Sequence, residues 1–190
     1  MSDTEKFIRK YVKMRIKSLE NRDSSTVKAR LARLRHGAGK IPGELPELWG
    51  EFLAGMPEEF LSRNGVPNYA EWAVYLSLTL FALHQQGKSE NVHSENISLG
   101  SAAAKLMEND TDDERERVLR RFGPVITANN MPEFSHHLRC LVQLMSSKNI
   151  KLDYEKLAVD IYEFQFPEFR KNVQLRWGQD FYYKKGEDKE

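Results

Sequence analysis

The chain has 190 residues and a formal net charge of +1, with 40% apolar and 30% charged residues, which predicts a globular protein with a substantial core. Its longest apolar stretch, residues 72–83, is too short to cross a bilayer, and its N-terminus lacks the apolar segment of a signal peptide. Because the chain has a single cysteine, no internal disulfide can form, and we expect a cytoplasmic protein that does not enter a membrane.

The first part of the chain predicts helices, because apolar residues recur every three or four positions. Two such stretches occupy residues 7–19 and 27–34, and a serine before the second, Ser24 or Ser25, can cap it. A turn rich in proline and glycine then precedes a short helix over residues 48–53.

The longest apolar helix is expected over residues 69–86. Asn68 and Glu71 form a capping-box pattern at its start, and Gly87 stands where a C-terminal cap is expected. The polar residues 88–97 have no periodicity and predict a loop.

The second half of the chain predicts further helices. A capping-box pattern at Thr111 starts a helix that we expect to stop at Gly123 and Pro124, since a proline disfavours helical backbone in the residue before it. The other helices are expected to begin near residues that suit a cap or a first turn: Ser98, Pro132, Asp153 and Pro167.

The fold class predicted by this pattern is all-α, a compact bundle of about eight or nine helices, because no segment alternates with a period of two. No internal repeat or long linker divides the chain. Residues 1–183 are therefore expected to form a single helical domain, with a division into N- and C-terminal lobes left open. Residues 184–190 are expected to form a flexible tail.

Charge is sorted along the chain although its sum is close to zero. Residues 1–40 hold 12 Lys and Arg against 4 Asp and Glu, and residues 115–151 hold 7 against 2. From Ser24 to Gly43 there is no carboxylate at all, and the basic side chains there are Lys28, Arg30, Arg33, Arg35, His36 and Lys40. Solubilising surfaces usually mix both signs, so this window favours contact with a polyanion such as nucleic acid.

The second basic block carries Arg115, Arg117, Arg120 and Arg121 on one expected helix and Arg139 on the next. Two interpretations stay open for it. The arginines can bind phosphate, or they can pair at helical spacing with nearby carboxylates, which are Asp112, Asp113, Glu114 and Glu116. The sequence does not decide whether the two basic blocks meet in space.

Residues that could carry chemistry form no convincing site. His136 and Cys140 are four positions apart and could face one metal ion, but no pattern supplies the further ligands, so a place at the edge of the core is favoured. A nucleophile elbow, a P-loop and a dinucleotide fingerprint are all missing. We therefore predict no catalytic residue, metal or cofactor and no enzyme activity. A helical metal-dependent enzyme and a helix-turn-helix DNA-binding regulator remain as alternatives.

Six stretches of the sequence, taken in order, resemble a known family. They begin with A-R-L-A-R-L-R-H-G-A-G-K-I-P-G-E-L-P-E-L-W at 29–49, A-L-H-Q-Q-G-K-S at 82–89 and I-S-L-G-S-A-A-A-K-L-M at 97–107. They continue with R-R-F-G-P-V-I-T-A at 120–128, M-P-E-F-S-H-H-L-R-C-L-V-Q-L-M at 131–145 and L-R-W-G-Q-D-F-Y at 175–182. Together they are similar to the CasB family, the small subunit of the type I-E CRISPR Cascade surveillance complex.

The resemblance implies a non-catalytic antiviral subunit in which basic residues hold the nucleic-acid backbone. It implies stabilisation of the crRNA–target heteroduplex and of the displaced DNA strand, the R-loop. The implied partners are crRNA and target DNA, other Cascade subunits and a second copy of the chain in a head-to-tail dimer, with no membrane. The implied nucleic-acid-binding residues are Lys28, Arg30, Arg33, Arg35, Lys40, Arg115, Arg120, Arg121 and Arg139.

Overall fold

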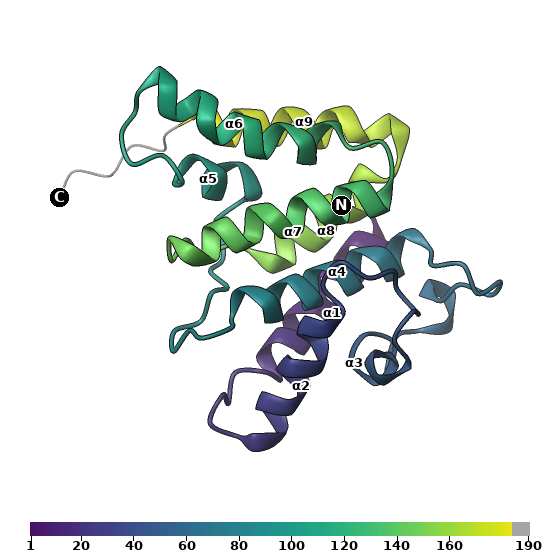
Figure 1. The fold of residues 1–190 in the computed structure, drawn as a ribbon. Helices are drawn as coiled ribbons and strands as arrows, with labels where there is room; N and C mark the ends of the chain where they lie inside the picture. The colour runs from purple at the N-terminus through teal and green to yellow at the C-terminus, as the bar shows by residue number, and fades with distance from the viewer. Residues whose placement is uncertain (184–190) are drawn as a thin grey trace.

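The computed structural model describes residues 1–183, and within them the chain forms nine α-helices and two short 3-10 helices (Figure 1). In chain order they are α1 (Asp3–Lys17), α2 (Ser25–His36), η1 (Pro46–Leu48), α3 (Trp49–Phe52), η2 (Glu58–Phe60), α4 (Tyr69–His84), α5 (Leu99–Ala104), α6 (Asp112–Thr127), α7 (Met131–Ser147), α8 (Tyr154–Phe164) and α9 (Pro167–Tyr182). Over these residues the only β-type pairing is one bridge between His93 and Leu152. The predicted all-α class is confirmed; the tail predicted for 184–190 lies outside the described residues.

Helix α4 is the centre of the core. Fourteen of its 16 residues are buried, because α1, α2, α7 and α8 all pack against it. A helix that is apolar on every side has to be enclosed in this way. The capping box at its start is confirmed, with Asn68 accepting from the Glu71 backbone N–H and Glu71 accepting from that of Asn68. At its end, burial lowers the pKa of His84 to about 4, so this histidine is uncharged at neutral pH.

The helices of the second half form a layer above α4 in the view of Figure 1, with α5 packed on α9 and α6 on α7. The small residues of α5 allow a close approach. A Cβ added to Gly100 would lie 2.1 Å from the backbone oxygen of Trp177, so only glycine fits between α5 and α9. The Trp177 ring is fully buried, and its Nε1–H donates to Asp160 on α8 over 2.7 Å.

The predicted end of α6 at Gly123 and Pro124 is wrong, since the helix continues to Thr127. Proline removes one backbone donor, but the last turn buries Val125 completely against the core. Side chains of α9 also bind the carbonyl groups at this end: Gln174 donates to the oxygen of Ile126 over 2.7 Å. Tertiary packing therefore holds a turn that the local sequence disfavours.

Candidate nucleic-acid interface

Helix α2 turns its basic residues outward because Val27, Leu31 and Leu34 occupy its buried side. Lys28 and Arg35, two turns apart, form no ion pair within residues 1–183. Both side chains reach solvent, Arg35 only in part. They are therefore cations available to an external anion.

Arg30 and Arg33, on the same helix, share one carboxylate partner from α3. Arg30 lies 2.9 Å from the nearer Glu51 oxygen, and Nη2 of Arg33 lies 3.0 Å from Oε1. Arg30 also donates to the backbone oxygen and the hydroxyl of Ser18, both over 3.2 Å, so it ties α2 to the end of α1. Arg30 is thus engaged on several sides, whereas Arg33 keeps part of its guanidinium free.

Glu51 is the residue of this site that sequence reasoning missed. It is only 6% exposed, and a buried carboxylate requires paired cations. Lys40 similarly pairs with Glu44 over 3.1 Å, and the Ile41 backbone N–H and Lys40 together lower the pKa of that carboxyl group. The window itself holds no carboxylate, but its basic residues do have carboxylate partners, because α3 supplies Glu51 and the loop between α2 and η1 supplies Glu44.

Helix α6 neutralises much of its own charge. Arg115 pairs with Asp110 and Asp112, and the hydrogen bond to Asp110 raises the pKa of Arg115. The other local pairs are longer and their arginines are more exposed: Arg117 with Glu114 at 3.5 Å and Arg120 with Glu116 at 3.7 Å. Of the two interpretations left open for this block, these three arginines show the pairing at helical spacing.

Arg121, by contrast, is exposed and has no ion pair among the described residues. It is adjacent in sequence to Phe122, which is fully buried, so the backbone that carries Arg121 is anchored in the core. Arg121 is therefore a further cation available on α6.

The two basic blocks meet where Arg139 of α7 lies against Gly39 in the loop after α2. A Cβ added to Gly39 would lie 3.1 Å from Nη1 of Arg139, and the backbone of Gly39 has a φ of +91° that suits glycine. The Nε atom of Arg139 is buried and has no hydrogen-bond partner. Arg139 thus brings α7 against the end of the first basic block and retains an unsatisfied donor.

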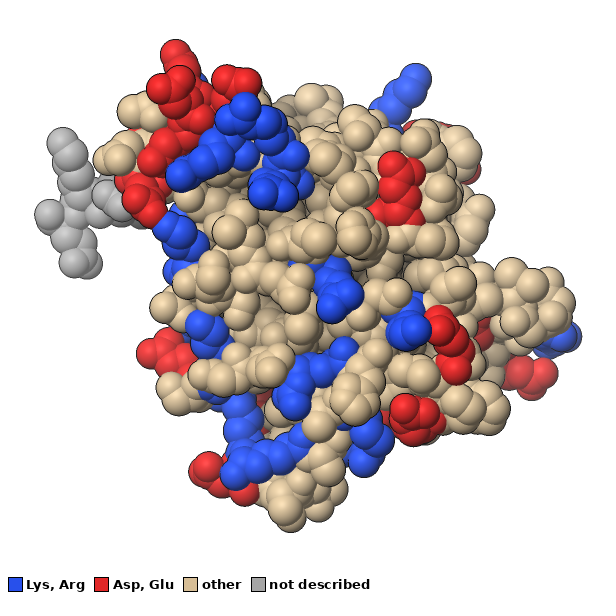
Figure 2. Space-filling model, viewed as in Figure 1, with Lys and Arg blue, Asp and Glu red and all other residues tan. Residues whose placement is uncertain are grey.

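Figure 2 shows basic side chains over α6 and, beyond a stretch of uncharged surface, further basic side chains over α7 and α2, with acidic side chains at the α6 end and on both flanks. We call the cations that keep donors free here the positive face: Lys28, Arg33, Arg35, Arg121 and Arg139. Their guanidinium and ammonium groups suit the phosphate oxygens of a nucleic-acid backbone.

Comparison with known proteins identifies the family. Residues 30–182 match the family described as CRISPR-associated protein Cse2. The chain also resembles the crystal structure of CasB from Thermobifida fusca, with 30% identity and a TM-score of 0.75 over 96% of this chain and 99% of that one. The chain belongs to the CasB (Cse2) family.

A second similar structure is that of M. ruber CasB, with 25% identity and a TM-score of 0.68 over 90% of this chain and 92% of that one. No curated protein matches the sequence. CasB proteins are structural subunits of the Cascade complex of CRISPR systems, so this chain is a Cascade subunit by family. The predicted resemblance is confirmed.

The metal-site alternative gains no support from the geometry of this CasB-family chain. Over residues 1–183, no three His, Cys, Asp or Glu side chains are grouped to hold a metal ion. The rings of His136 and His137 contact each other at 5.3 Å, and Cys140 is exposed as a free thiol. In the same part of the chain, no helix is long and apolar enough to cross a membrane.

Proposed function

We propose that this chain is the non-catalytic small subunit of a type I-E Cascade complex in the cytoplasm and that its positive face binds nucleic-acid backbone. Through these backbone contacts the subunit stabilises the crRNA–target heteroduplex and the displaced DNA strand of the R-loop. The observation that carries the proposal is the contact between Arg139 of α7 and Gly39 in the loop after α2, which brings an arginine of the second basic block against the first block.

The free-energy balance of R-loop formation allows a few cations to stabilise it. Exchange of the DNA duplex for an RNA–DNA heteroduplex is nearly balanced in free energy, so modest backbone contacts decide its direction. Arg139 is partly exposed and has no ion pair among the described residues, so its guanidinium group can bind a phosphate oxygen. Lys40 and Arg120 have exposed carboxylate partners and can exchange them for phosphate at low cost. Arg30 and Arg115 each have more than one partner within the protein and therefore support the surface structurally.

The test is binding of single-stranded DNA and RNA as a function of salt, with Arg35, Arg121 and Arg139 replaced by Ala. Loss of three phosphate contacts should reduce the magnitude of the negative slope of log K against log salt by about 2 and weaken binding at least tenfold. A matched variant with Arg63, Lys105 and Lys171 replaced by Ala loses the same charge from other elements and should bind like the wild type. Equal losses in the two variants would reject the assignment of the face.

Cys140 provides a second readout because it is the only cysteine, is exposed and follows Arg139 directly. Bound single-stranded DNA should slow alkylation of this thiol in the wild type and not in the Arg35, Arg121 and Arg139 variant. An alkylation rate that DNA leaves unchanged would contradict binding across α7. In a reconstituted Cascade, the same variant should shorten the lifetime of the R-loop on double-stranded target.

A further inference from the structure

The loop after α2 makes a tight turn that ends in a carboxylate. Residues 41–44 read I-P-G-E, and the backbone N–H of Glu44 donates to the Ile41 oxygen over 3.1 Å. Pro42 stands at the second position of the turn and Gly43, with a φ of +94°, at the third, which are the residue types that suit a type II turn. Proline and the backbone hydrogen bond restrict this turn, so the position of Glu44 is fixed by the local sequence.

The carboxylate of Glu44 binds two groups, one with each oxygen. Oε2 accepts the Ile41 backbone N–H over 3.1 Å, and Oε1 accepts from Nζ of Lys40 over 3.1 Å. The Ile41 hydrogen bond and, after it, Lys40 lower the pKa of the Glu44 carboxyl group, so this group is ionised at neutral pH. Lys40 therefore has a charged partner that is already in place before any ligand binds.

This pair lies next to the contact between the two basic blocks. Lys40 directly follows Gly39, the residue against which Arg139 lies. Both members of the pair reach solvent, since the Lys40 side chain is 51% exposed and that of Glu44 is 43% exposed. A phosphate group that approaches Lys40 consequently meets the negative charge of Glu44 at the same place.

Glu51, the other carboxylate that pairs with basic residues of this region, differs in burial. It is only 6% exposed and is shared by Arg30 and Arg33, so its release would leave charges unpaired inside the protein. An exposed pair contributes little to stability and can exchange partners. Glu44 is therefore the carboxylate that an incoming phosphate can displace, whereas Glu51 belongs to the architecture.

We infer that Glu44 is an autoinhibitory carboxylate, which occupies Lys40 until a nucleic-acid phosphate displaces it. This inference rests on the proposed function and adds a means of regulating the same surface. Displacement of Glu44 lowers the affinity of every strand that contacts Lys40 by the same factor. Strands that touch the surface at few points then dissociate, while a strand held at many points stays bound.

The experiment measures binding of single-stranded DNA to the isolated chain across a salt series, with Glu44 replaced by Gln. The Gln side chain keeps an oxygen for the Ile41 N–H and loses the charge, so the turn should persist and the unfolding midpoint should stay near that of the wild type. Affinity at low salt should rise about threefold, as expected when one exposed ion pair no longer has to be broken. The negative salt slope should steepen by about 0.7, because Lys40 gains one phosphate contact.

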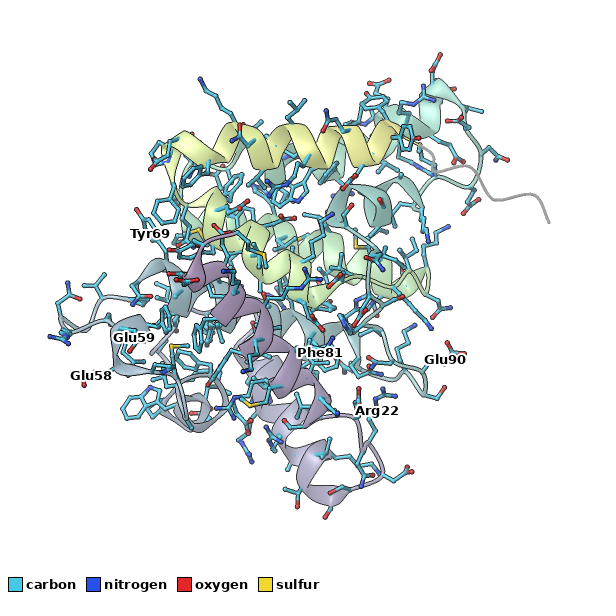
Figure 3. All side chains as sticks on the ribbon, turned by 180° about the vertical axis from the view of Figure 1, so that it is seen from behind. Arg22, Glu58, Glu59, Tyr69, Phe81 and Glu90 are labelled. Atoms are coloured by element: carbon cyan, nitrogen blue, oxygen red, sulfur yellow. The ribbon has the colours of Figure 1, made fainter. Side chains whose placement is uncertain are left out.

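Two other exposed carboxylates serve as controls, and neither has an ion pair within residues 1–183. Glu47 is the near control: burial and then the charges of Glu44 and Glu47 raise the pKa of Tyr75, so both carboxylates lie near the same hydroxyl group. Glu59 is the distant control, and Figure 3 shows it beside Glu58 at one edge of the molecule. Glu47→Gln should tighten binding much less than Glu44→Gln, and Glu59→Gln should not tighten it. An equal gain from either control would overturn the inference, since negative charge alone would then explain the effect.

A double-mutant cycle tests whether Glu44 acts through Lys40. In a chain that carries Lys40→Ala, Glu44→Gln should no longer tighten binding, because there is no cation to release. A gain that persists in full would overturn autoinhibition, since Glu44 would then repel the strand directly. A wild type that binds no nucleic acid would reject the proposed function and this inference with it. Unchanged affinity of Glu44→Gln, beside weakened binding by the Arg35, Arg121 and Arg139 variant, would reject the inference alone.

Discussion

Helices α2 and α6 both carry several basic residues, but their arginines are neutralised in different ways. On α2, Arg30 and Arg33 share Glu51, a buried carboxylate that reaches them from α3. On α6, Arg115 and Arg120 pair with carboxylates on or next to their own helix. Removal of one partner from a buried pair leaves an unpaired buried charge and is costly, whereas an exposed pair three or four residues apart contributes little.

This difference shows that a run of like charge contains residues with different roles. Arg30 has side-chain and backbone partners on two elements and is only 20% exposed, which makes it part of the architecture. Arg35 and Arg121 lie in the same basic runs and have no ion pair within residues 1–183. Nucleic-acid binding and stability should therefore be lost in different variants, and the following experiments test this separation.

The largest effect on stability is expected for Glu51→Ala. Removal of this carboxylate leaves two half-buried guanidinium groups without their partner, and we expect a loss of roughly 2–3 kcal/mol in the free energy of unfolding. The value stays near the low end for buried pairs because Arg33 can turn to solvent. Urea unfolding followed by circular dichroism measures it.

Asp112→Ala on α6 is the matched control for this prediction, since it removes one exposed partner of Arg115. Its unfolding midpoint should remain close to that of the wild type. If both variants lose the same stability, the distinction between the two helices is wrong.

On α2, we expect DNA affinity to depend on Arg35 and stability to depend on Arg30. Arg35→Ala removes a free cation and should weaken binding of single-stranded DNA about fivefold and lower the salt slope by about 0.7, with the unfolding midpoint unchanged. Arg30→Ala should lower the midpoint and leave the affinity of the folded fraction near the wild-type value. Fluorescence anisotropy across a salt series, below both unfolding midpoints, provides the measurement. A larger affinity loss for Arg30→Ala would reverse the assigned roles.

The sequence alone was sufficient for the helices, for N-caps such as the Asn68–Glu71 box and for the family, because these depend on local patterns. The C-terminal cap predicted at Gly87 was wrong, since α4 ends at His84 and Gln85 is its C-cap. It could not predict the partners of α2. Glu51 comes 21 residues after Arg30, and only the packing of α3 against α4 brings it back to α2. The continuation of α6 past Pro124 could not be predicted for the same reason, since it depends on the burial of Val125 and on the hydrogen bond from Gln174 of α9.

The contact between the two basic blocks can be tested by substitution of Gly39, which should have a moderate effect on both stability and DNA affinity. Gly39→Ala places a Cβ against the Arg139 guanidinium and forces a left-handed backbone on alanine, which costs about 1 kcal/mol. We expect a lower unfolding midpoint and a twofold to threefold weaker affinity for DNA, because Arg139 is displaced. Gly43→Ala has a similar φ of +94° but no neighbour within 4 Å, so it should lose stability without losing affinity. Equal affinity losses would show that backbone strain alone, and not Arg139, sets the effect.

The smallest expected effect is a gain in affinity for single-stranded DNA. Glu116 is exposed and pairs loosely with Arg120 at 3.7 Å, so Glu116→Gln removes a negative charge near the phosphate path and frees the arginine. Binding of single-stranded DNA should become about twofold tighter at low salt, and the gain should vanish at high salt because exposed charges are screened there. Glu168→Gln, which removes an exposed carboxylate from the first turn of α9, is the control and should not change affinity. If Glu116→Gln leaves affinity unchanged, Arg120 does not contact the DNA backbone, and Arg121 is the one arginine of α6 that the proposal retains.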